Sequence, residues 1–132
     1  MKKLVLLITI FTVALALPSI AQTNITGAFV GTLPSATLAG STGGDITFLN
    51  LTKADTLSTT NRSFTIISFS FSAKINGAAV NITSTSNQIN ADMKASIKKL
   101  VVGNQVLFNN IKAKYKPAGS THNLASMTFT IK

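Results

Sequence analysis

The chain has no cysteine, no tryptophan and no glutamate, and its only acidic residues are three aspartates. Without cysteine no disulfide can form, so a small domain must take its stability from an apolar core. The same absence excludes a lipid-anchored lipoprotein, because that export route needs a cysteine at the cleavage site.

Groups that could perform acid–base chemistry are equally scarce. A catalytic nucleophile needs a base and a group that orients the base, and a zinc site needs three or four ligands. The chain offers for these roles only His122, Tyr115 and the dispersed aspartates Asp45, Asp55 and Asp92. We therefore expect no catalytic residue, no cofactor and no metal site, and we interpret His122 as a solvent-exposed loop histidine.

The first 21 residues have the pattern of a secretory signal peptide. Lys2 and Lys3 precede an uncharged apolar run at residues 4–17, which is shorter than the roughly 18–20 residues that span a bilayer. Small residues at the −3 and −1 positions predict cleavage between Ala21 and Gln22. We therefore expect a periplasmic or secreted protein with no transmembrane segment after cleavage.

After cleavage, residues 22–132 are enough for one domain. Removing two lysines leaves ten basic residues against three aspartates, a net charge of about +7. This excess could attract nucleic acid, an anionic membrane or an acidic protein. Nucleic-acid binding favours exposed aromatics for stacking, whereas the alternation here assigns the aromatics to the core, so we expect no nucleic-acid partner.

The clearest strands flank the dipeptide Asn76-Gly77. Apolar and polar residues alternate on both sides of it, and Asn-Gly is the preferred two-residue hairpin turn because both positions need positive φ. Upstream, the apolar residues Phe64 and Ile66 occupy even-numbered positions, whereas the apolar residues nearer the turn occupy odd-numbered positions, so the parity of the alternation changes. This change predicts a β-bulge near residue 67.

Two further strands are predicted at residues 106–116 and 124–131, joined by a turn at 117–120. In the first of them the parity changes between Phe108 and Ile111. We expect a second bulge or a bend between these two residues.

The remaining elements are less regular. Residues 28–30 fit a strand, whereas residues 46–51 fit either a strand or a short helix. A helix over about residues 91–100 is predicted, because Asn90 can cap it and Asp92 lies in its first turn. Several short strands with one short helix predict a mainly β fold, a β-sandwich.

From about residue 63 to the C-terminus, three features follow one another in order. They are the hairpin FTIISFSFSAKINGAAV, the stretch SNQINADMKASIKKLVVGNQVLFNNIKAK, and a final apolar strand after the turn Pro117-Ala118-Gly119. In this order they resemble the C-terminal domain family of the gliding-motility and type IX secretion protein GldM of Bacteroidetes. The usual family turn has an acidic residue where this chain has Ala118.

The resemblance implies an immunoglobulin-like β-sandwich in the periplasm that binds other envelope proteins. In that family such domains form part of a shaft that passes motion from the inner membrane to the outer membrane. Because this chain carries a cleavable signal, we expect the fold and the protein binding but not the motor role, and any link to gliding or secretion stays open. Asp55-Thr56-Leu57 also matches the short O-glycosylation motif of exported Bacteroidetes proteins.

Lys112, Lys114 and Lys116 are the candidates for a partner-binding site. At strand spacing their ammonium groups share one face, where they could bind carboxylates or phosphates. Lysines also protect a sheet edge from aggregation, and this simpler interpretation is the favoured one. The function we expect is a non-catalytic interaction module for an envelope protein, with cationic binding of anionic lipid or polysaccharide as the alternative.

The cleavage site has a direct test. The intact mass of the exported protein should correspond to residues 22–132, because the signal peptidase selects small residues at −1 and −3. An exported protein that keeps the mass of all 132 residues would contradict the prediction.

Overall fold

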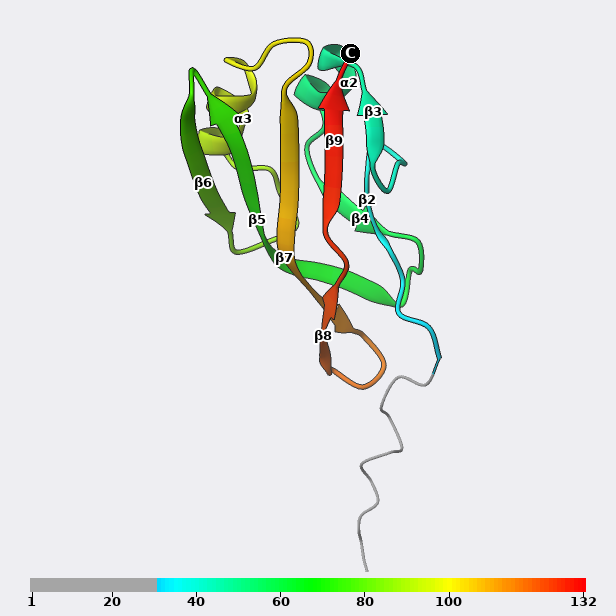
Figure 1. The fold of residues 1–132 in the computed structure, drawn as a ribbon. Helices are drawn as coiled ribbons and strands as arrows, with labels where there is room; N and C mark the ends of the chain where they lie inside the picture. Colours follow the sequence, from blue (N-terminus) through cyan, green and yellow to red (C-terminus); the bar gives the residue numbers. More distant parts are fainter. Residues whose placement is uncertain (1–30) are drawn as a thin grey trace, which may run out of the picture. The chain divides into compact units, whose positions relative to one another are not determined.

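The computed structural model describes residues 31–132, which form one compact unit. The signal peptide, its cleavage point and the strand predicted at 28–30 lie outside these residues. The described part of the chain is mainly β, as predicted (Figure 1). Its elements are β2 (Ala36–Leu38), β3 (Gly44–Ile46), α2 (Phe48–Lys53), β4 (Leu57–Thr59), β5 (Phe64–Ile75), β6 (Ala78–Ser84), α3 (Ala91–Ile97), β7 (Gln105–Tyr115), β8 (Thr121–Leu124) and β9 (Met127–Ile131).

Most of the strands belong to one six-stranded sheet. Its order is β3-β9-β7-β5-β6, with β8 beside the C-terminal half of β7. The pairs are antiparallel except for β3 and β9, which run parallel. A two-stranded sheet of β2 and β4 lies with α2 and α3 behind the large sheet (Figure 1). The described residues therefore build two layers around one core.

The predicted hairpin around Asn76-Gly77 is confirmed. Both turn residues have positive φ, 52° for Asn76 and 81° for Gly77, as a two-residue turn of this kind requires. The flanking residues Ile75 and Ala78 are paired, and β6 continues beside β5 for its whole length. The turn therefore sets the register of the hairpin.

Strands β5 and β7 change phase at the same level of the sheet, where both bulges were expected. Pairing passes from Ser70↔Asn109 to Ser68↔Lys112, where β7 carries one more residue than β5, and then to Ile66↔Ala113, where β5 carries one more residue than β7. Asn110 has φ of 49°, in the left-handed region that asparagine enters more readily than most residues. The sheet bends here (Figure 1). The burial pattern of both strands keeps apolar side chains on one face on both sides of the bend.

The same irregularity divides the last predicted strand. Met127 pairs with Phe108 and Leu124 with Ile111, so β8 and β9 follow different halves of β7. Leu124 and Met127 are both buried although they lie three positions apart. The continuous strand predicted at 124–131 is therefore wrong, because the partner strand is itself bulged at this level.

Phe108 lies at the centre of the core. Its ring centroid is 6.0 Å from that of Phe69, 5.6 Å from Phe71 and 6.2 Å from Phe129. The four side chains are fully buried, and their tilted or edge-on geometry is the one that aromatic rings favour. Together they join β5, β7 and β9 into one packed layer.

Two helices complete the core, where one was predicted. Residues 46–51, which fitted either a strand or a helix, contain the end of β3 and the start of α2. The helix begins after Thr47 because the Thr47 side chain accepts a hydrogen bond from the Asn50 backbone N–H at 3.1 Å. The predicted cap of α3 is confirmed, since Asn90 Oδ1 accepts from the Met93 backbone N–H at 2.9 Å. Helix α3 ends at Ile97, earlier than predicted, because the chain tightens there into i→i−3 bonds.

The bulge in β7 predicts a strict preference at residue 110. Replacing Asn110 with Val should lower the free energy of unfolding by about 1–2 kcal/mol, because a β-branched residue is strained at positive φ. Asn110→Gly should keep or raise it, because glycine adopts this conformation freely. Chemical denaturation measures both variants, and equal stabilities for the two would show that the bulge is not needed.

Candidate binding surface

The large sheet has one covered face and one that no described element covers. We call the second the open face. Alternation along each strand places on it Ser70, Ser72 and Lys74 of β5, Ala79, Asn81 and Thr83 of β6, Gln105, Leu107, Lys112 and Lys114 of β7, and Thr128 and Thr130 of β9. All except Ser70 are exposed or half-buried. The open face is thus rich in hydroxyl and amide groups.

A hollow lies in the upper part of the open face. Leu107 lies in it, half-buried, and four of the side chains around it are Ser72, Asn81, Gln105 and Thr128. An apolar side chain with hydroxyls and amides around it can bury a partner's apolar group and still satisfy polar neighbours.

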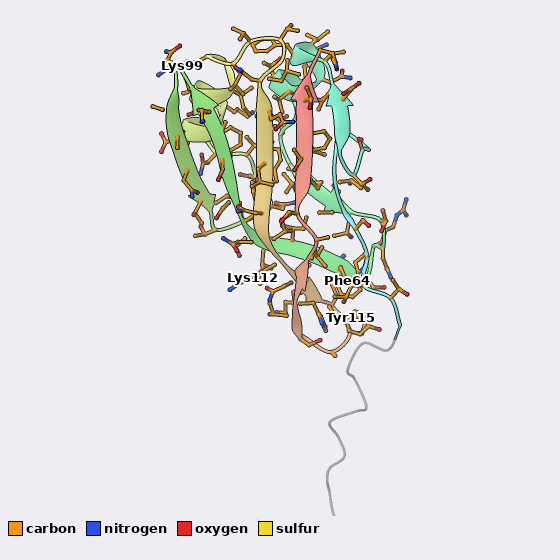
Figure 2. The ribbon with its side chains drawn as sticks, viewed as in Figure 1. Phe64, Lys99, Lys112 and Tyr115 are labelled. Carbon is orange, nitrogen blue, oxygen red and sulfur yellow. The ribbon has the colours of Figure 1, made fainter. Side chains whose placement is uncertain are left out.

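Lys112 and Lys114 lie below this hollow, beyond the bend. Lys112 is flanked by Ser68 of β5 and Asn123 of β8, and it points away from the sheet (Figure 2). Both side chains are exposed, and their Cα atoms are about 7 Å apart because they occupy alternate positions of one strand. Neither pairs with a carboxylate among residues 31–132.

The described carboxylates that form ion pairs do so with other lysines. Asp55 is paired with Lys94 of α3, and Asp45 lies 3.9 Å from the ammonium of Lys132. The positive charge of Lys112 and Lys114 is therefore not neutralised by an ion pair within the described domain.

The structure contradicts the favoured interpretation of these lysines as protectors of a sheet edge. Strand β7 is interior, paired with β5 on one side and with β8 and β9 on the other. Its edges are not available to another strand, so lysines on it have no edge to protect. Their place is the middle of the open face.

Lys116 is placed differently from the other two. It follows the end of β7, where its backbone N–H donates to the Ser63 carbonyl at 2.8 Å. Its side chain lines a separate hollow with Arg62 and Phe64. The structure therefore keeps Lys112 and Lys114 together on the strand and separates Lys116 from them.

His122 is not the loop residue that was expected. It lies in β8, half-buried, with its ring 5.8 Å from that of Phe64 in an edge-on contact. Its Nε2 is 2.9 Å from the Ser120 hydroxyl, and Phe64 also packs on Tyr115 at 5.1 Å (Figure 2). These contacts give His122 a packing role at this end of the sheet.

The surface also has an apolar feature at the end of the domain away from Tyr115. Val101 and Val102 are 62% and 70% exposed in the turn between α3 and β7. Lys98 and Lys99 lie in the same connection, separated from Val101 by the buried Leu100, and are exposed, with Lys99 at that end of the domain (Figure 2). We call residues 98–102 the valine turn.

Between residues 31 and 132, no three His or Asp side chains gather where they could hold a metal ion. Neither described helix is long and apolar enough to cross a membrane.

Sequence reasoning found the lysines but missed the hollow around Leu107. The signal was the run of serine and threonine between apolar residues, which predicts a polar sheet face. Which strands lie side by side depends on pairing between distant segments, and β9 pairs with residues 105–108 of β7, before the bulge. A comparison with known proteins found no family model that matches this chain and no curated protein with significant similarity to it.

Proposed function

We propose that the protein is an exported, non-catalytic interaction module whose open face binds an acidic protein of the bacterial envelope. The observation that carries this proposal is the pair Lys112 and Lys114, which lie exposed on an interior strand without a carboxylate partner in the described domain. Two like charges on one face of a strand repel each other, and neither forms an ion pair within the described domain. A negatively charged partner would make this arrangement favourable.

The spacing of the two lysines favours a protein partner. Acidic residues at alternate positions of an extended segment also have Cα atoms about 7 Å apart, so one such segment could meet both ammonium groups. The same segment could place an apolar side chain over Leu107 in the hollow. Charge would then guide the encounter, and the hollow would supply contact area.

The resemblance to the GldM C-terminal domain family supports the same proposal. It suggests an immunoglobulin-like fold and a location in the bacterial envelope. A mostly antiparallel sheet backed by a smaller sheet is compatible with such a fold. The parallel pair of β3 and β9 is a departure that any such relationship must accommodate. Secretion or gliding machinery is one setting that would fit.

A double substitution tests the docking surface. The full chain carrying Lys112→Gln and Lys114→Gln should recover less of its partner from envelope extract than the unaltered chain, with a loss of roughly tenfold or more in affinity. The measurement is a pull-down followed by identification and titration of the recovered protein. Its binding should also weaken as salt is raised.

The control is a second double variant, Lys98→Gln with Lys99→Gln. It removes the same charge from another exposed site, so a general attraction would fall equally in both variants. Equal loss in the two variants, or no protein recovered repeatedly, would refute docking through the open face.

The valine turn favours a second candidate function, binding to anionic lipid. Two exposed valines preceded by two lysines can place apolar groups among acyl chains and cations among headgroups. This candidate uses the end of the domain and not the open face.

Vesicles of phosphatidylglycerol separate the two candidates. If lipid is the partner, the full chain should sediment with these vesicles at low salt but not with phosphatidylcholine vesicles, and Val101→Ser with Val102→Ser should abolish most of the binding. The variant with Lys112→Gln and Lys114→Gln should then bind the vesicles nearly as well as the unaltered chain. No binding to either vesicle would refute anionic lipid as the partner of the valine turn.

A further inference from the structure

The outer edge of β6 is unpaired within the described part of the chain. Strand β6 ends the large sheet, and β5 is its one described strand partner. Its seven residues, AAVNITS, include no charge and no proline, the usual devices against strand addition. It is also regularly paired with β5 over its whole length, without a bulge.

The hairpin turn fixes which backbone groups face this edge. Ile75 and Ala78 flank a two-residue turn and form a hydrogen-bonded pair, after which bonded and non-bonded pairs alternate. The N–H and C=O groups of Ala79, Asn81 and Thr83 therefore point away from β5. The Thr83 carbonyl accepts from Asn90 Nδ2 at 3.3 Å, which agrees with this direction.

We propose that two copies of the chain associate by antiparallel pairing of their β6 strands about a twofold axis at Asn81. In this register Asn81 faces Asn81 of the second copy, and Ala79 faces Thr83 of the second copy. These are the three residues whose backbone groups point outward, so the register uses all of them as hydrogen-bonded pairs. At Thr83 the carbonyl would accept from Ala79 of the second copy as well as from Asn90 Nδ2, since a carbonyl oxygen can accept two hydrogen bonds. The two large sheets then join into one.

The side chains of β6 suit this symmetric pairing. Val80 and Ile82 are half-buried on the covered side of the sheet. Across the axis, Val80 would face Ile82 of the second copy, and Ile82 would face Val80 of the second copy. Apolar area that one copy leaves partly exposed would be buried by the second. On the open face, the two Asn81 amides would lie opposite one another, where each can donate and accept.

Charge does not oppose the association strongly. The lysine nearest to the edge is Lys74, which lies one strand in, opposite Ala79. In the proposed register the two Lys74 side chains are about 20 Å apart, well beyond the screening length of about 8 Å at physiological salt. A twofold axis perpendicular to the sheet keeps both open faces on the same side.

Opposite charges at one position test the register. Analytical ultracentrifugation of the full chain should show a species of twice the chain mass, and Asn81→Lys or Asn81→Asp alone should raise its dissociation constant roughly tenfold or more. An equimolar mixture of the two variants should associate again, because the twofold axis then places Lys and Asp opposite each other. Raising the salt concentration should strengthen the unaltered dimer, because the two copies are alike in charge.

The matched controls are Asn123→Lys and Asn123→Asp on β8, which make the same charge changes at another exposed strand position. They should leave the dissociation constant unchanged, and circular dichroism should show that all four variants fold. A chain that stays monomeric at every concentration, or variants at position 81 whose mixture does not associate, would overturn the proposal. So would a complex with a different protein that Asn81→Lys abolishes while the chain alone stays monomeric.

Discussion

The bulge at Asn110 in β7 is the constraint on which the rest of the domain depends. Side chains alternate along a strand, so an unbroken alternation from Phe108 onward would turn Ile111 outward and point Lys112 into the core. The left-handed conformation of Asn110 interrupts the alternation and returns Ile111 to the buried side. Core and open face therefore have a common origin, because one backbone irregularity keeps the apolar residues inside and the lysines outside.

The bend also sets the chemistry of the two halves of the open face. Above it, β7 presents Leu107 among hydroxyl and amide groups, and below it the same strand presents Lys112 and Lys114. A partner that reaches across the bend would meet an apolar centre and a cationic patch. The rings packed on Phe108 hold β5, β7 and β9 in place from behind, so this surface is supported by a rigid layer.

Local signals predicted the parts of the fold that local physics decides. The Asn76-Gly77 turn and the Asn90 cap were readable because each depends on residues next to it. The change of phase at Asn110 was readable from parity alone. The meaning of the lysines was not, because whether a strand lies at an edge or in the middle is decided by pairing between distant segments. Local parity placed Lys112 correctly on the strand, and topology then reversed its interpretation.

The position of β9 has a consequence for how the domain is built. The strand formed by Met127–Ile131 lies between β3 and β7, although it is the last strand along the chain. Until these residues are available, Phe108 lacks its neighbour Phe129 and β3 has no strand to pair with. Folding therefore depends on contacts between distant parts of the sequence, which form slowly. A chain that still lacks Met127–Ile131 cannot close its core around Phe108 and stays open on this side of the sheet.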